Sequence, residues 1–167
     1  PEENGFASVA DIVRLPDGAL RMYYTALQSI GNGGVQSAIR SAWSTDEGLT
    51  WTRDAGWRLG PGTFGPAGVM DPAVVRLADG SFRMYVTYQG LQYPPPGAAH
   101  QIFSATSRDS VNFTPDDGVR LTAGAVPLEA AGIVDPFPVL LPDGTVRLYY
   151  STKCSDAALA AGGCFSQ

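Results

Sequence analysis

One short pattern occurs three times along this chain of 167 residues. Each copy begins with an Asp before an apolar run, turns at an Asp-Gly pair and continues into a run rich in Arg and Tyr. The copies span residues 11–26, 71–89 and 135–153. Their central aspartates, Asp17, Asp79 and Asp143, are 62 and 64 residues apart (79 − 17 and 143 − 79). A fixed period with one internal pattern indicates a supersecondary unit that is used repeatedly.

Each copy is predicted to be a β-hairpin. Asp-Gly between two apolar runs is a strong hairpin signal, because Gly adopts positive φ without steric cost. The runs before the turns are apolar almost throughout, apart from Arg14 and Arg76, which predicts strands buried on both faces. The runs after the turns alternate, as Leu20 and Met22 do with Arg21, and this period of two predicts half-buried strands.

The first two hairpins are each followed by a second, weaker similarity. Residues 41–52 and 104–114 both contain a short strand, a polar turn and an aromatic residue that opens another strand. Four-stranded antiparallel units at this period predict β-propeller blades. We therefore expect an all-β chain in which residues 1–167 form a partial β-propeller. Its parts are one blade at 8–53, a second at 71–116 and a partial blade at 135–167.

The length of the chain corresponds to about two and a half such blades. A propeller must close a ring of at least four or five blades, since an open stack exposes unpaired strand edges and apolar faces. Five blades at this repeat length need about 300 residues. Two explanations stay open: the chain is a fragment of a longer polypeptide, or another chain completes the ring.

Charge and composition exclude several classes of partner. The net charge is −5, and the 11 basic residues are scattered rather than clustered, so we expect no nucleic-acid partner. No apolar run approaches the roughly 18 residues of a membrane span, so we expect no membrane partner either. One histidine and no Cys-x-x-Cys motif make a metal site a poor interpretation, and we expect no cofactor.

The two cysteines, Cys154 and Cys164, lie close together near the end of the chain. Their spacing across a loop that ends in Gly-Gly predicts a disulfide that ties this loop down. The alternative is two free buried thiols, because Cys is among the most buried residue types. A disulfide would predict an oxidising compartment, and hence a secreted protein that is extracellular or periplasmic.

Two motifs carry a resemblance to known families. Residues 44–51 (STDEGLTW) match the Asp-box, S-x-D-x-G-x-x-W, of sialidase-type propeller blades, and residues 107–113 look like a shorter, degenerate copy. The Asp-Pro pairs, apolar runs, Asp-Gly turns and aromatic-rich return strands resemble the five-bladed propeller glycosidases of the arabinanase, xylosidase and invertase group. This resemblance covers most of the chain and implies a five-bladed ring that hydrolyses a plant or microbial glycan. The Asp-box itself is a turn device, in which Asp and Ser side chains bind backbone amides.

Asp71 and Asp135 are the candidate catalytic residues. Each lies eight residues before its Asp-Gly turn and precedes a proline, which marks the entrance of a strand. In a propeller the first strands of the blades line the central channel, so equivalent positions on neighbouring blades should bring both carboxylates to one funnel. Glycoside hydrolysis needs such a pair, with a separation of roughly 6.5–9.5 Å for inversion.

The resemblance assigns a role to each carboxylate. It implies that Asp71 is the general base and that Asp135 orients the substrate and tunes the acid, which would be a Glu from another blade. Glu129 is the nearby candidate for that acid, although its surroundings (VPLEAAG) differ from the Glu motif of the family. In the first blade, the position of Asp71 is occupied by Val9.

A structural interpretation of these aspartates stands beside the catalytic one. An Asp-Pro pair is good turn chemistry, its carboxylate can cap backbone amides, and repetition favours a scaffold role. Two functional classes therefore stay open. One is a carbohydrate-active enzyme, and the other is a non-catalytic propeller that binds carbohydrate or protein. An acidic trio in one funnel would favour the enzyme, whereas carboxylates occupied by backbone amides would favour the binding module.

Overall fold

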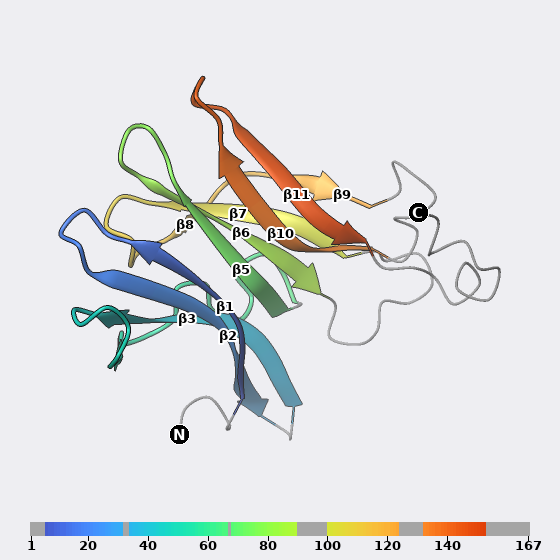
Figure 1. Cartoon of the computed structure of the whole chain (residues 1–167). Helices are drawn as coiled ribbons and strands as arrows, with labels where there is room; N and C mark the ends of the chain where they lie inside the picture. The colour runs from blue at the N-terminus through green and yellow to red at the C-terminus, as the bar shows by residue number, and fades with distance from the viewer. Residues whose placement is uncertain (1–5, 32–33, 67, 90–99, 124–131, 153–167) are drawn as a thin grey trace, which may run out of the picture.

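The computed structural model describes residues 6–31, 34–66, 68–89, 100–123 and 132–152, and these residues are all-β (Figure 1). No helix occurs in this described part of the chain, as the sequence predicts. The strands are β1 (Ala7–Arg14), β2 (Leu20–Gly31), β3 (Gly34–Ser44), β4 (Thr52–Arg53), β5 (Gly68–Arg76), β6 (Phe82–Gln89), β7 (Gln101–Ser107), β8 (Thr114–Pro115), β9 (Leu121–Thr122), β10 (Ile133–Leu140) and β11 (Val146–Thr152).

The strands form three antiparallel sheets, one for each copy of the repeat. The first has the order β1-β2-β3-β4, the second has the order β5-β6-β7-β8 with β9 also paired to β7, and the third consists of β10 and β11. Apart from β9, consecutive strands of each sheet pair with each other, which is the meander of a propeller blade. The predicted partial propeller is therefore confirmed.

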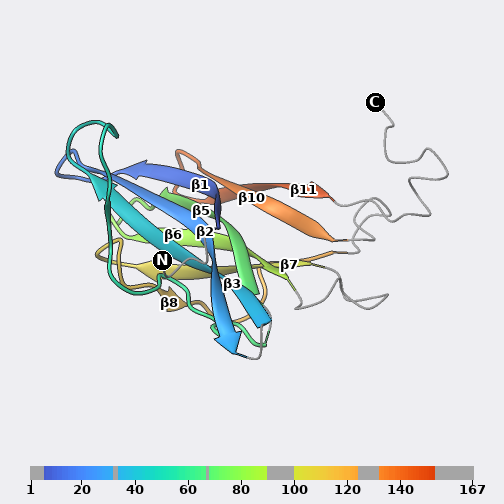
Figure 2. The same ribbon diagram turned by 90° about the horizontal axis from the view of Figure 1, so that it is seen from below.

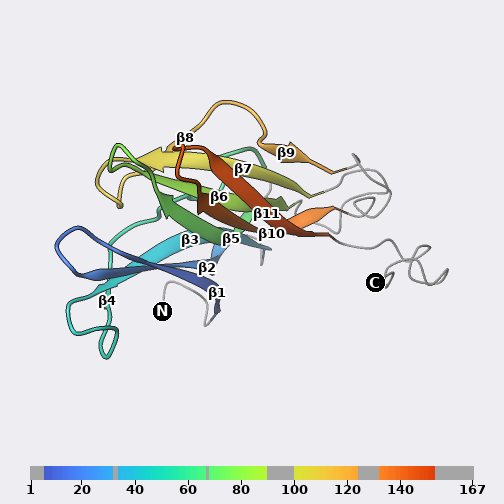
Figure 3. The same ribbon diagram turned by 45° about the horizontal axis from the view of Figure 1, so that its top comes forward.

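The first strands of the three sheets lie next to one another. β5 lies between β1 and β10 and contacts both (Figures 1 and 3). Seen from below, the later strands β2, β3, β6 and β7 extend away from this row (Figure 2). This arrangement brings equivalent positions of successive repeats to neighbouring strands, which is the condition that the candidate site requires.

The Asp-Gly turns have one conformation in all three hairpins. In the first, Gly18 N donates to Leu15 O at 3.0 Å and Leu15 N donates to Ala19 O at 2.8 Å. Gly18 adopts a φ of 91°, and Asp17 Oδ1 accepts a hydrogen bond from Ala19 N at 3.1 Å. This is a three-residue loop in which the left-handed residue after the turn must be Gly to avoid strain.

The core lies between the sheets. Tyr23 and Ile39 of the first sheet pack against Val74, Met84 and other residues of the second. A second cluster joins the second sheet to β10 and β11, and its members are Tyr85, Ile102, Ile133, Val75, Leu121, Ala123, Val146 and Leu148. The sheets are therefore held face to face by apolar burial, the dominant favourable term in folding.

The expectation that all incoming strands are buried on both faces is only partly right. β5 has six buried residues among nine and lies between two other sheets. β1 instead alternates between exposed and half-buried positions. The physical reason is its position, since the described structure places a sheet against only one side of β1.

The turn conformation makes a stability prediction for Gly18. A Cβ at Gly18 would meet no atom within 4 Å, so Gly18→Ala tests the backbone conformation alone. We expect a loss of about 1–2 kcal/mol in the free energy of unfolding, which is the cost of a left-handed non-Gly residue. Urea denaturation followed by circular dichroism measures it.

Gly60→Ala is the matched control for this substitution. Gly60 is outside the left-handed region, and its added Cβ would contact Trp57 Cβ at an ordinary 3.7 Å. We expect no loss of stability, because Ala mainly restricts the unfolded chain at such a position. Equal destabilisation by both substitutions would contradict the conformational explanation.

Candidate functional site

The candidate aspartates share an unusual backbone conformation. Asp71 and Asp135 have φ values of 53° and 52°, and Val9, at the same position of the first repeat, has 43°. In each hairpin the strand register shifts at this residue, which marks a β-bulge. Positive φ is uncommon for non-Gly residues and a genuine outlier for a β-branched one, and such strained positions cluster at functional sites. The first strands of the three sheets, β1, β5 and β10, therefore contain the same distortion.

The amide of each left-handed aspartate is bound by the preceding blade. Asp71 N donates to Thr25 Oγ1 at 3.0 Å, and Asp135 N donates to Thr87 Oγ1 at 3.2 Å. Thr25 and Thr87 both lie eight residues after the Asp of their own hairpin turn, on β2 and β6. One hydroxyl per blade thus fixes the strained backbone of the next blade.

The structure places two of the three predicted catalytic residues, Asp71 and Asp135, and their exposures differ. Asp71 is buried within β5, whereas Asp135 is exposed on β10. Their strands, β5 and β10, contact each other. Glu129 lies outside the described residues. The expected separation of the Asp71 and Asp135 carboxylates, within about 10 Å, stays a prediction.

Asp11 is a site residue that the sequence did not single out. Its Oδ2 accepts a hydrogen bond from Val74 N at 2.6 Å, and its Oδ1 accepts one from Ile12 N at 2.9 Å. Val74 lies three residues after Asp71, so Asp11 links β1 to the strand that carries the candidate base. Burial raises the pKa of Asp11, and the two amide hydrogen bonds partly oppose this effect.

A polar seam joins the first two blades further from the aspartates. Arg21 forms an ion pair with Asp54 (Nε to Oδ2, 3.2 Å) and donates to Ser110 Oγ. Tyr23 OH donates to Ser110 O at 2.7 Å, and burial raises the pKa of this phenol. Arg58 Nη1 donates to Val111 O at 3.0 Å. These contacts give both buried arginines and the buried phenol a polar partner and link the first blade to residues 110–111 of the second.

The turn at residues 44–51 is closed by its own side chains. Ser44 Oγ accepts a hydrogen bond from Gly48 N at 2.9 Å, and Asp46 Oδ1 accepts one from Thr50 N at 2.9 Å. Trp51 Nε1 donates to Gly48 O at 3.0 Å. The hydrogen bonds from Thr50 and Ser44 lower the pKa of Asp46 to about 2. This carboxylate therefore serves its turn rather than catalysis.

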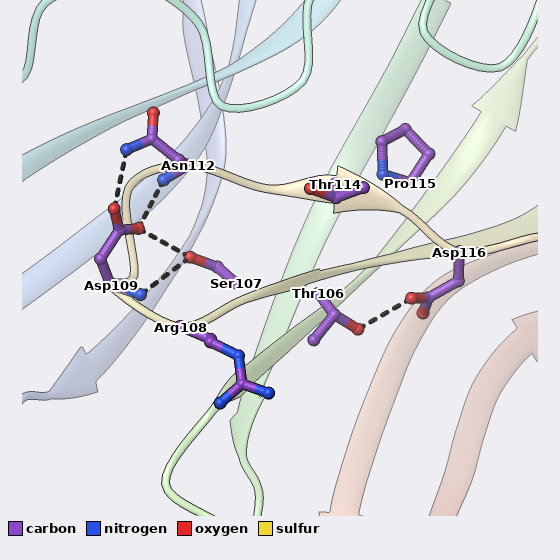
Figure 4. A pocket seen from close by; sticks show the side chains of 8 residues that line it. All are labelled: Thr106, Ser107, Arg108, Asp109, Asn112, Thr114, Pro115 and Asp116. Carbon is purple, nitrogen blue, oxygen red and sulfur yellow. Dashed lines mark hydrogen bonds between the residues drawn. The ribbon is translucent and has the colours of Figure 1, made fainter.

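The second outer turn follows the same scheme beside a polar hollow of about 440 Å³ (Figure 4). Asp109 Oδ1 accepts hydrogen bonds from Asn112 N at 2.7 Å and Val111 N at 2.9 Å, which hold its pKa well below the usual range. Asp116, on the other side of the hollow, accepts from Thr106 Oγ1 at 2.8 Å. Both carboxylates are engaged by neighbouring groups, so this hollow offers no pair for glycoside hydrolysis.

The described residues contain no group of three or more His, Cys, Asp or Glu side chains that could hold a metal ion. Within the same described ranges, no helix is both long and apolar enough to cross a membrane.

The pKa of Asp11 makes a prediction about pH. The Asp11 carboxyl group binds its proton more tightly in the native chain than in the unfolded chain, where the pKa of an Asp is about 3.9. The stabilisation is therefore complete below that value and is lost as the pH rises through the raised native pKa. We expect the free energy of unfolding of the wild type, relative to Asp11→Asn, to fall over this pH window. Urea titrations at a series of pH values measure it, and a difference that grows with pH would contradict the assignment.

Comparison with known proteins shows what this fold is similar to. The chain matches no protein-family model and no curated protein. A family 117 glycoside hydrolase of the marine bacterium Zobellia galactanivorans matches with a TM-score of 0.65 and 19% identity over 86% of this chain and 47% of that protein. A thermostable family-43 glycoside hydrolase matches with a TM-score of 0.65 and 18% identity over 86% of this chain and 48% of that protein.

A third similar structure is a Hadza microbial sialidase, with a TM-score of 0.60 and 20% identity over 84% of this chain and 31% of that protein. The chain thus spans about half the length or less of these enzymes. At these identities the likeness shows the fold alone, and this fold is shared with the glycoside hydrolases named above.

Proposed function

We propose that this chain is part of a five-bladed propeller glycoside hydrolase that acts on a carbohydrate. The observation that carries the proposal is the left-handed bulge shared by Asp71 and Asp135, each with its amide bound by a threonine of the preceding blade. Strain of this kind is maintained where the surrounding structure over-determines it, and it is often part of a functional site. The likeness in fold to glycoside hydrolases supports the same conclusion.

In this proposal Asp71 acts as the general base of an inverting hydrolysis. Its carboxylate takes a proton from water as the water oxygen attacks the anomeric carbon, and a second carboxyl group protonates the leaving oxygen as the glycosidic bond breaks. Asp135 orients the substrate and tunes the acid. The acid is a Glu, either Glu129 or a residue of another blade.

The proposal includes the blade boundaries and the outer turn. We assign blades to residues 8–53 and 71–116 and a partial blade to residues 135–167, with further blades completing the ring. We also assign residues 44–51 to an Asp-box of the sialidase type. The hydrogen bonds of Ser44 and Asp46 within this turn support that assignment and give it a structural role.

A non-catalytic propeller that binds carbohydrate or protein is the alternative, and one observation favours it. Val9 has the same left-handed bulge as Asp71 and Asp135, although it carries no carboxylate. The bulge can therefore form as a scaffold feature without any chemistry attached to it. The two functions differ in whether the assembled ring cleaves the glycan that it binds.

Asp71→Asn tests the enzymatic function in the assembled ring. The amide keeps the shape of the side chain and loses the base, so we expect kcat to fall by about 10²–10⁴-fold while the thermal unfolding midpoint changes little. Release of reducing ends from arabinan, xylan and fructan measures turnover. Asp79→Asn, in the hairpin turn after the same strand, is the matched control and should leave turnover unchanged.

Two outcomes would count against this assignment. An Asp71→Asn protein that cleaves its glycan at the wild-type rate would exclude the role of base. A wild-type ring that binds a glycan, as followed by calorimetry, and releases no reducing ends would support the binding module instead.

We further propose that the protein is secreted and carries a disulfide between Cys154 and Cys164, which lie outside the described residues. Alkylation under non-reducing, denaturing conditions should then label neither thiol. A bridge across so short a loop would contribute about 2–3 kcal/mol, so reduction should loosen the tail without unfolding the blades. Labelling of both cysteines would remove the support for an oxidising compartment.

A further inference from the structure

We define the forward face of the first and second sheets as the side that packs against the next sheet in the chain. The forward face of the third sheet is the side that carries the equivalent residues. The signature of a forward face is an Arg, a Tyr and a hydroxyl residue at alternate positions of the second strand. The three sets are Arg21, Tyr23 and Thr25 on β2, Arg83, Tyr85 and Thr87 on β6, and Arg147, Tyr149 and Ser151 on β11. The side opposite to each forward face is called the rear face below.

The forward face of the first sheet is fully used. Tyr23 is buried, packs in the cluster that contains Val74 and Met84 of the second sheet, and donates its hydroxyl hydrogen to Ser110 O. Thr25 accepts the amide of Asp71. The contact between the first sheet and the second therefore combines apolar packing with a hydrogen bond from a backbone amide to a threonine hydroxyl.

The second sheet repeats this interface. Tyr85 is buried and belongs to the cluster that contains Ile133 and Val146 of the third sheet. Thr87 Oγ1 accepts a hydrogen bond from the backbone amide of Asp135, as Thr25 Oγ1 accepts one from the backbone amide of Asp71. The same residues at the same positions thus bind the following sheet twice.

The forward face of the third sheet has the same signature but is open. Tyr149 is 54% exposed and Phe137, directly opposite it on the neighbouring strand, is 64% exposed, so both aromatic residues lie on this face. Arg147 and Ser151 are exposed as well. Exposed apolar patches with a polar surround mark interaction surfaces.

The rear face of the first sheet is partly covered by its own Trp51 and Trp57, and the part around Ile12 is open. Ile12 is 50% exposed, whereas Val74, its equivalent 62 residues later, is 8% exposed because it packs against the first sheet. Beside Ile12 lies a hollow of about 580 Å³ whose lining includes Phe6, Val9, Met22, Tyr24, Ala42 and Trp51. Val9 has the left-handed conformation that a hydroxyl of a preceding sheet fixes in the other two repeats.

We propose that the forward face of the third sheet binds the rear face of the first sheet in a second copy of this chain. Both halves of one interface type lie on the same chain, and that interface already occurs twice within it. In the new contact Ser151 Oγ accepts the amide of Val9, and Tyr149 and Phe137 pack on Ile12 and the hollow beside it. Such a head-to-tail contact is heterologous, so it either closes a ring or extends. The proposal depends on the blade packing and is independent of the catalytic assignment.

Sedimentation equilibrium of the 167-residue chain tests the contact. We expect the mean mass to rise with concentration above the 17.6 kDa of one chain. Tyr149→Glu and Ile12→Glu should each weaken the association at least tenfold, because each places a charge in a surface that must lose its water. Leu49→Glu is the control, since Leu49 is 84% exposed on the outer turn and belongs to neither face.

Mixing the two variants tests the head-to-tail geometry. Each variant keeps one intact face, so an equimolar mixture should form a dimer of twice 17.6 kDa and nothing larger. Circular dichroism verifies the fold of each variant, and Phe137→Glu replaces Tyr149→Glu if the latter does not fold. A monomeric wild type, an association that survives both substitutions, or a mixture that stays monomeric would overturn the proposal.

Discussion

A hydrogen bond from the amide of a left-handed aspartate to a threonine hydroxyl of the preceding blade occurs at both boundaries between successive sheets. It joins Thr25 to Asp71 and Thr87 to Asp135 at equivalent places. A buried amide without an acceptor costs about 1–3 kcal/mol, and a strained φ adds to that cost. One hydroxyl of the preceding sheet therefore satisfies the amide at the bulge and stabilises the left-handed conformation of Asp71 and of Asp135.

Polar contacts give the blade boundary its specificity, while apolar contacts give it most of its strength. The clusters around Tyr23 and Tyr85 bury apolar surface, which is non-directional. Hydrogen bonds are directional. The bond from Val74 N to Asp11 Oδ2 and the bond from Arg21 to Ser110 Oγ therefore favour one register between the sheets. A boundary built in this way holds the first strands of neighbouring sheets, β1, β5 and β10, next to one another.

The sequence predicts the sheets better than it predicts the site. The Asp-Gly pairs predict the hairpins, because their turn chemistry is local, and the structure confirms the partial propeller. The left-handed conformation of Asp71 and the role of Thr25 were not predicted, because both depend on a contact 46 residues apart in sequence. The role of Asp11 was not predicted either, because its contact with Val74 is also distant in sequence. The equivalent positions of the other repeats are Ala73 and Phe137, so the repeat pattern does not mark this carboxylate. The exposure of β1 depends on which described sheets pack against it, and the local sequence pattern does not encode that.

The hydroxyl–amide bond also has a direction along the chain. The acceptor always precedes its donor in sequence, as Thr25 precedes Asp71 and Thr87 precedes Asp135. During synthesis from the N-terminus, each template hydroxyl is already present when the strand that must adopt the strained conformation leaves the ribosome. Each new blade can then fold against a blade that has already folded. Synthesis from the N-terminus thereby favours pairing of each strand within its own blade over pairing with a similar strand of another repeat.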